Sequence, residues 1–405
     1  MKRIYLAALV LWSATNATAS GVQLTAPQPR KDAWYGYSVS ANGNTLAVIS
    51  YDDPVAGVVY VYQPTTKNWN TAKLVAQLTA SDGTPFTSVA VYGNVVLAGA
   101  FYEQNSQGAV YGFIEPQGGW KNSTESFTLT ASDGAAGDIF GSSVAFSNKT
   151  IVVGAPGHKI GGLTSGAAYV FTEPVSGWTS ATQTAELTSG GPGEAFGQSV
   201  AVNGPVVVVG VPEPNSNGAL FVYQENVGGW QDGTETARLT DPGSGCQQLG
   251  QAVVIVGNTV VGSFTQECQD GEAQVPVVVY NRPGNAWTSM SVPTAKLTAK
   301  ENLAGHNGFG ASLALTNKFL LVGDPQFGWP KNVDGGIFLY AAPEGGWENV
   351  VNGTENEVIK PGTGGKNSLF GTSAAALSTG ALFVGAPLFV VDGNAGAGAV
   401  FIKSY

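Results

Sequence analysis

Short apolar runs recur along the whole chain, and small polar turns separate them. The clearest example is residues 138–178, in which the runs GSSVAF, TIVVGA and GAAYVF are followed by Trp178. The runs are almost continuously apolar, which is typical of strands buried on both faces. No stretch repeats its apolar residues with the 3.6-residue period of an α-helix. The pattern therefore predicts an all-β protein.

Three landmarks recur in the same order, and they define seven copies of one unit. Each copy begins at a glycine-like position in an FG-type motif: Gly36, Thr87, Gly141, Gly197, Gly250, Gly310 and Gly371. A Gly-Ala-Pro-like motif follows, and then a strand with a central Tyr or Phe. After that strand comes a Trp in most copies, and finally a strand that reads like AxLT. In the fifth copy Val277 replaces the central aromatic.

Each copy thus holds four strands, and short polar turns such as Asn203-Gly204 join the first two as a hairpin. Seven such units predict a seven-bladed β-propeller of four-stranded antiparallel blades, whose radial arrangement protects the sheet edges. A pair of β-sandwiches would not explain a repeat of about 50 residues. We expect a single domain over residues 20–405, with repeats near 34–80, 85–131, 138–188, 194–240, 247–299, 308–361 and 368–405.

The two ends of the chain complement each other. The last copy stops after its third strand, at residues 398–403, whereas an isolated AxLT-type strand at 21–27 precedes the first copy. We infer that the N-terminal strand becomes the fourth strand of the last blade, which would leave the ring without an open edge.

The motif set FGxSVAV, VVVGAP and GAAYVF resembles the FG-GAP repeat, and the chain is similar to the N-terminal seven-bladed propeller of integrin α chains. The resemblance covers nearly all of the chain after residue 19. It implies the propeller fold and adhesion-type binding. Integrin-like repeats often carry a calcium loop between the first two strands. Calcium takes six to eight oxygen ligands, and the turns here are short and hold no DxDxDG motif. We therefore expect no calcium at the hairpin loops and no other cofactor or metal.

Residues 1–19 have the pattern of a secretory signal peptide. Lys2 and Arg3 precede an apolar core, and Ala17-Thr18-Ala19 forms a small-x-small cleavage site. A membrane anchor is the alternative, but the apolar run is much shorter than the ~20 residues that span a bilayer. We expect a secreted protein, or a periplasmic one in a Gram-negative source. No later stretch is suited to crossing a membrane.

The chain is acidic, with a net charge of −10 that becomes −12 (18 − 2 − 28) once residues 1–19 are removed. Such a charge repels phosphate backbones and argues against nucleic acid as a partner. Charged residues make up only 11% of the chain.

The only two cysteines, Cys246 and Cys268, each lie 11 residues from the hairpin turn at Gly257. Equal distances from an antiparallel turn place them opposite each other, so we predict a disulfide. Three sequons after residue 19, at Asn122, Asn148 and Asn352, are candidate N-glycosylation sites. All three fall on the face that carries the hairpin turns and the Trp loops.

The opposite face gathers the loops that follow the Gly-Ala-Pro motifs and precede the FG motifs, and such loops carry function in most scaffolds. Its candidate ligand-binding residues are Tyr51, Asp52, Tyr102, His158, Lys159, Phe327, Trp329 and Asp392. The aromatic residues among them are candidates for stacking on a sugar or a partner, although they would equally serve as caps of the blade cores.

The sequence contains no nucleophile elbow, zinc motif, phosphate loop or dinucleotide fingerprint. The isolated Asp82-Gly83 and Asp133-Gly134 pairs read as turns. The leading hypothesis is a secreted, non-enzymatic propeller that binds a glycan or an extracellular protein through its loop face. A secreted hydrolase or lyase with its site in the central channel is the alternative from another class, and a structural module of an envelope or matrix is a third.

Overall fold

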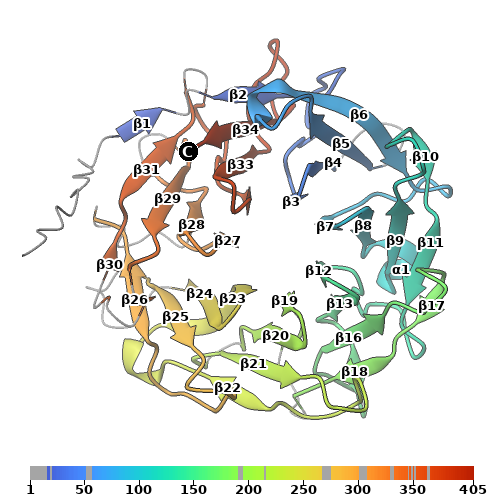
Figure 1. Ribbon diagram of the computed structural model, residues 1–405, viewed down its shortest axis with the longest axis vertical. Coiled ribbons are helices and arrows are strands. Elements are labelled where there is room, and N and C mark those ends of the chain that lie inside the picture. The colour runs from blue at the N-terminus through green and yellow to red at the C-terminus, as the bar shows by residue number, and fades with distance from the viewer. Residues whose placement is uncertain are drawn as a thin grey trace, which may run out of the picture.

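The chain forms a ring of radial β-sheets around a central opening (Figure 1). The computed structural model describes residues 16–18, 21–51, 57–189, 195–213, 216–266, 275–300, 308–328, 333–344, 346–347, 350, 353–362 and 365–405. Within these ranges the only helices are α1 (Glu103–Ser106) and the 3-10 turns η1 (Trp69–Thr71) and η2 (Pro242–Ser244), and none of them could span a bilayer. The fold is therefore all-β, as the apolar pattern predicts.

Four antiparallel strands make up each blade, in chain order from the channel outward. Blade 1 consists of β3 (Val39–Asn42), β4 (Thr45–Ser50), β5 (Val58–Pro64) and β6 (Ala72–Thr79). Blade 2 consists of β7 (Ser88–Tyr92), β8 (Val95–Ala100), β9 (Ala109–Ile114) and β11 (Phe127–Thr130). Blade 3 consists of β12 (Ser143–Ser147), β13 (Thr150–Ala155), β16 (Ala167–Thr172) and β18 (Ala185–Leu187).

The remaining blades follow the same order. Blade 4 consists of β19 (Ser199–Asn203), β20 (Val206–Val211), β21 (Ala219–Gln224) and β22 (Ala237–Leu239). Blade 5 consists of β23 (Gln247–Val256), β24 (Thr259–Gln266), β25 (Val277–Asn281) and β26 (Ala295–Thr298). Blade 6 consists of β27 (Ser312–Leu315), β28 (Phe319–Asp324), β29 (Gly336–Ala341) and β31 (Glu357–Lys360).

Blade 7 joins the two ends of the chain. It consists of β32 (Ser373–Ala376), β33 (Ala381–Ala386), β34 (Ala399–Ser404) and the N-terminal β2 (Val22–Leu24). Strand β2 runs antiparallel to β34, with Val22 opposite Ile402 and Leu24 opposite Val400. The inferred closure of the last blade is therefore confirmed.

Short segments also tie each blade to the one before it. Strands β10 (Ser123–Thr124), β17 (Ala181–Thr182) and β30 (Gly353–Thr354) add in parallel to the outer strands β6, β11 and β26. Strand β1 (Asn16–Thr18) takes the same place on β31 of blade 6. The outer edge of that blade is thus covered by residues that lie within the predicted signal peptide.

The core lies between the blades. Seven clusters of buried apolar residues occur, and each combines side chains from two neighbouring blades, including blades 7 and 1. The second strand of blades 1 to 4, 6 and 7 is buried along its whole length. Because a buried cluster joins every pair of neighbouring blades, the ring has no separate halves.

The FG and Gly-Ala-Pro motifs meet at these interfaces. The Ser143 hydroxyl of blade 3 donates a 2.8 Å hydrogen bond to the carbonyl oxygen of Gly197, the FG glycine of blade 4. A Cβ on Gly154 would lie 2.0 Å from that same oxygen. Glycine is required there because the next blade approaches the strand so closely.

Candidate functional site

Five aromatic rings gather on the loop face at the junction of blades 1 and 2; we call Trp34, Tyr37, Tyr51, Phe101 and Tyr102 the aromatic cluster. Trp34 stacks on Tyr51, with ring centroids 5.3 Å apart and planes 18° apart, and on Tyr37 at 6.3 Å. Tyr51 also contacts Tyr37 at 5.4 Å and Tyr102 edge-on at 6.5 Å, and Phe101 lies 4.1 Å from Tyr102. The rings therefore form one continuous group.

The repeat landmarks position these rings. Trp34 precedes the FG glycine of blade 1, Tyr51 directly follows β4, and Phe101 and Tyr102 directly follow β8. The backbone at Trp34 has φ of 47°, a left-handed conformation that is uncommon for a bulky residue. A hydrogen bond of 2.9 Å from the Trp34 N–H to the Gly396 carbonyl of blade 7 holds it there.

The cluster is partly open to solvent. Tyr102 is 50% exposed and Tyr37 is 36% exposed, whereas Trp34, Tyr51 and Phe101 are half-buried. Burial, together with the neighbouring Tyr102, raises the pKa of Tyr37, so its hydroxyl stays protonated at neutral pH. Gln104 and Asn105 follow the cluster in sequence and are exposed. The surface therefore combines ring faces with neutral hydrogen-bonding groups.

The other candidate residues of the loop face differ in how far they are exposed to solvent. Asp392 is exposed, and its loop is bonded to the segment before the cluster through the 2.9 Å contact of Asp32 N–H with the Ala395 carbonyl. Phe327 is only 5% exposed and packs edge-on against Phe338 at 5.3 Å, so its expected place on a binding surface is wrong. It caps the core of blade 6. Asp52 and Trp329 lie outside the described residues.

His158 and Lys159 belong to a second pocket, of about 370 Å³, on blade 3. Lys159 is exposed, but the His158 side chain is only 8% exposed and lies among carboxylates. Its Nδ1 is 2.9 Å from Asp138, and its Nε2 is 3.5 Å from Asp133 and 3.8 Å from Glu186. Sequence reasoning did not find this cluster, because Asp133, His158 and Glu186 are at least 25 positions apart and each alone resembles a turn or strand residue.

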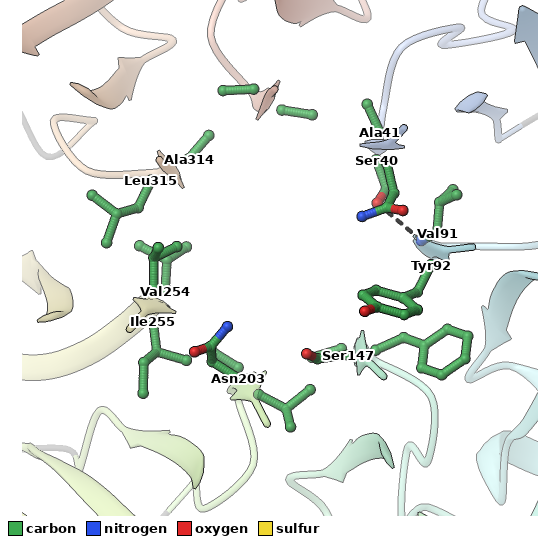
Figure 2. A pocket seen from close by; sticks show the side chains of 18 of the residues that line it. Ser40, Ala41, Val91, Tyr92, Ser147, Asn203, Val254, Ile255, Ala314 and Leu315 are labelled. Atoms are coloured by element: carbon green, nitrogen blue, oxygen red, sulfur yellow. Dashed lines mark hydrogen bonds between the residues drawn. The ribbon is translucent and has the colours of Figure 1, made fainter. Parts of the chain in front are cut away.

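The central channel, of about 360 Å³, is lined by the innermost strands (Figure 2). Its polar groups already bind neighbouring strands: Ser40 Oγ accepts from the Val91 N–H at 3.1 Å, and Asn203 Oδ1 accepts from the Gly257 N–H at 3.1 Å. Among the described residues that line it, none is Asp, Glu, His, Lys or Arg. The channel wall thus supplies no converging pair of carboxylates.

The hairpin turns do not fit a calcium site. In blade 3, Ser147 pairs with Thr150, which leaves only Asn148 and Lys149 in the turn. All seven hairpin turns are described, and none contains Asp or Glu. The carboxylate oxygens that such a calcium loop needs are not available there.

The structure describes one of the two cysteines and two of the three predicted glycosylation sites. Cys246 is buried next to Gln247, which pairs with Gln266 at the open end of an extended hairpin, and no described cysteine is free. Cys268 and Asn352 lie outside the described residues, so the disulfide stays a prediction. Asn122 and Asn148 are exposed, and Asn122 Oδ1 accepts a 2.8 Å hydrogen bond from the Gln77 N–H.

Comparisons with known proteins agree with the architecture. One solved structure is similar to this chain, with a TM-score of 0.52 and 11% sequence identity. The aligned region spans 77% of this chain and 82% of the other protein's chain. The other protein is a Bacteroides uniformis protein whose name assigns it provisionally as a 6-phosphogluconolactonase. At this identity the likeness concerns the fold alone. No curated protein matches the sequence.

The fold and its repeating interfaces define the class of the molecule, a seven-bladed β-propeller. Residues 124–171, which contain most of blade 3, match the family model of the FG-GAP repeat. This match confirms that the propeller carries the FG-GAP repeat that the sequence motifs predict.

Proposed function

We propose that this protein is a secreted, non-enzymatic propeller that binds a carbohydrate through the aromatic cluster. The observation that carries the proposal is the continuous group of five rings, two of them well exposed, on the loop face. Sugar rings present apolar C–H faces that pack against aromatic faces, while their hydroxyls need neutral hydrogen-bonding partners. Tyrosine and tryptophan supply such contact area at a low cost in conformational entropy.

Secretion is part of this proposal, and the sequence of residues 1–19 supports it. The two sequons that the structure describes are exposed, and the topology places them on the face opposite the aromatic cluster. Attached sugars would therefore leave the aromatic cluster accessible. An extracellular protein is the other class of ligand that such a surface suits, because aromatic residues also dominate protein interfaces.

The test is a glycan array followed by titration of the best oligosaccharide, read by intrinsic fluorescence. We expect Tyr102→Ala to weaken binding at least ~10-fold, as removal of an exposed aromatic anchor commonly does. Tyr92→Ala is the matched control, because it removes the same side chain from the channel wall. Absence of binding to any glycan would contradict the carbohydrate proposal, and loss of binding in Tyr92→Ala alone would place the site in the channel.

A further inference from the structure

Blade 3 brings together three side chains with the chemistry of metal ligands. Asp133 lies in the turn between β11 and β12, His158 follows β13, and Glu186 lies in β18. One atom of each, the imidazole nitrogen and two carboxylate oxygens, lies within 4.8 Å of the others. The three residues are far apart in sequence, so the packing of the blade assembles the cluster.

The imidazole is held in the orientation that a metal ligand needs. Asp138, whose side chain is 3% exposed, faces His158 Nδ1 at 2.9 Å, and its Oδ2 also accepts a 2.8 Å hydrogen bond from the Ala135 N–H. A carboxylate at this distance assigns the ring proton to Nδ1. The lone pair of Nε2 then faces the pocket, as in the carboxylate–histidine–metal arrangement of many metal sites.

The carboxylates of Asp133 and Glu186 face the same nitrogen, His158 Nε2. Asp133 Oδ1 accepts a 3.1 Å hydrogen bond from the Tyr169 hydroxyl, which leaves Oδ2 facing His158 Nε2. Glu186 Oε1 lies 3.8 Å from the same nitrogen, so both carboxylates face it. Two carboxylates that repel each other at the mouth of a pocket are stabilised by a bound cation.

The spacing is too long for strong hydrogen bonds but suits a shared ion. Nε2 lies 3.5 Å from Asp133 and 3.8 Å from Glu186, whereas N–H···O bonds are about 2.7 to 3.2 Å long. Ligands bound at about 2.0 to 2.1 Å around a tetrahedral ion stand roughly 3.3 Å from one another. Small rotations of the two carboxylates would complete that geometry.

We propose that Asp133, His158 and Glu186 bind one divalent transition-metal ion, Zn²⁺ being the best fit, with the fourth position open to the pocket. Imidazole and carboxylate together are ligands that Zn²⁺ favours. Calcium fits poorly because it requires six to eight oxygen ligands. The site lies on blade 3, whereas the aromatic cluster lies at the junction of blades 1 and 2, and no residue is shared between them. The metal site does not depend on the proposed carbohydrate binding.

Blade 2 provides an internal control. Asp82 and Tyr111 form the same carboxylate–hydroxyl contact there as Asp133 and Tyr169 form in blade 3. Glu103 stands where blade 3 has His158, three residues after the last residue of the second strand. Thr128, opposite Tyr111, stands where blade 3 has Glu186. Blade 2 therefore forms the same turn and carboxylate–hydroxyl contact without a histidine and without a carboxylate at the position of Glu186. The fold of the blade does not require these two residues.

The test is a Zn²⁺ titration of the full chain after treatment with a chelator, followed by calorimetry and by thermal melting. The wild-type protein should bind one Zn²⁺ and melt at a higher temperature when the ion is present, because the ion binds only the folded state. Glu186→Gln and Asp133→Asn should each weaken the affinity at least ~100-fold. Asp82→Asn, the matched substitution in blade 2, should leave the affinity unchanged.

Substitution by Co²⁺ gives a second readout, since the absorption of a tetrahedral nitrogen and oxygen site differs from that of the hydrated ion. This spectrum should appear in the wild type and in Asp82→Asn, and should be lost in Glu186→Gln. If Asp133→Asn unfolds the turn, the half-buried Glu186→Gln decides the question. The proposal is overturned if the wild type does not bind Zn²⁺, if Ca²⁺ binds more tightly than Zn²⁺, or if Glu186→Gln retains full affinity.

Discussion

The Ser373 hydroxyl donates a 2.8 Å hydrogen bond to the carbonyl oxygen of Gly36, across a separation of 337 residues. The same bond joins Ser88 to Gly141, Ser143 to Gly197, Ser199 to Gly250 and Ser312 to Gly371. In each pair the serine lies just after the FG-type position of one blade, and the glycine is the FG-type glycine of the next blade. The hydrogen bond between Ser373 and Gly36 therefore joins blade 7 to blade 1. The equivalent bonds join blades 2 and 3, 3 and 4, 4 and 5, and 6 and 7.

The glycine of the Gly-Ala-Pro motif makes this contact sterically feasible, and we predict that Gly385→Ala destabilises the ring closure. A Cβ at Gly385 would lie 2.0 Å from the Gly36 carbonyl oxygen, so the two blades would have to move apart. We expect a loss of about 3 kcal/mol in the free energy of unfolding, from the overpacking. Ser373→Ala, which removes only the hydrogen bond, should cost about 1 kcal/mol.

Chemical denaturation of the two variants measures both effects. Gly362→Ala is the control, because a Cβ there meets no atom within 4 Å. A Gly385→Ala protein as stable as Gly362→Ala would show that the blades tolerate separation at this interface.

The fold could be predicted because its motifs repeat. The details of blade 5 could not, because its sequence departs from the repeat. The FG and Gly-Ala-Pro motifs are local in sequence, yet they report a contact between blades, so seven aligned copies indicate a ring. Blade 5 departs from the pattern, since Ala252 replaces the motif serine and its N–H bonds to Ser263 Oγ at 3.1 Å instead. Its first two strands are also longer and contain a register shift between Leu249 and Val253.

A candidate site residue could be predicted from the sequence only where its place in the repeat identified it without knowledge of its partners. Tyr51 and Tyr102 follow the second strands directly and are visible in the sequence, but their partner Trp34 depends on its contact with blade 7. Phe327 occupies the same loop position as His158, three residues after the second strand, and packs into the core. Both side chains are buried, so the position in the repeat determines burial, while the residue type determines the partners: Phe327 packs on Phe338 and His158 faces Asp138.

The closing strand β2 should contribute much more to stability than the segment before it. Deleting residues 1–27 removes Leu24 and Ala26 from the core shared by blades 7 and 1 and exposes the edge of β34. We expect a loss of at least about 3 kcal/mol, comparable with a large-to-small substitution in a core. Deleting residues 1–19 removes β1, which pairs with β31 at the outer edge of blade 6, and leaves β2 in place.

The melting temperatures of the two truncated proteins separate these contributions. The shorter deletion matches cleavage at the predicted signal-peptide site, and we expect it to lower the melting temperature only slightly. Equal stability of the two truncated proteins would contradict the structural role of β2.

The predicted bond between Cys246 and Cys268 would close the end of the long hairpin of blade 5. A bond that closes a loop of roughly 20 residues is expected to stabilise a protein by about 3 kcal/mol. Peptide mapping of protein exported with the predicted signal peptide, with and without reductant, should find the two cysteines linked. Cys268→Ala should melt at a lower temperature than the wild type. Free thiols at both positions in the secreted protein would rule the bond out.

Glu186 should make the stability of the metal-free protein depend on pH. Its pKa is raised by burial and by the charges of Asp133 and Asp232, against the opposing effect of His158. A carboxyl group with a raised pKa binds its proton more tightly in the folded state, so the free energy of unfolding falls as the pH rises from the ordinary glutamate pKa of 4.5 through the raised pKa. Glu186→Gln should therefore stabilise the chelator-treated protein at pH 7 by about 0.5 to 1 kcal/mol.

Melting curves in chelator from pH 4 to 8 test this dependence, and the advantage of Glu186→Gln should shrink as the pH falls below the ordinary pKa of a glutamate. Added Zn²⁺ should reverse the order at pH 7, because the wild type gains the ion and the variant does not. Thr128→Val, at the equivalent position of blade 2, serves as the control with no charge to remove. A Glu186→Gln protein that is less stable than the wild type at pH 7 in chelator would show that attraction to His158 outweighs the repulsion between carboxylates.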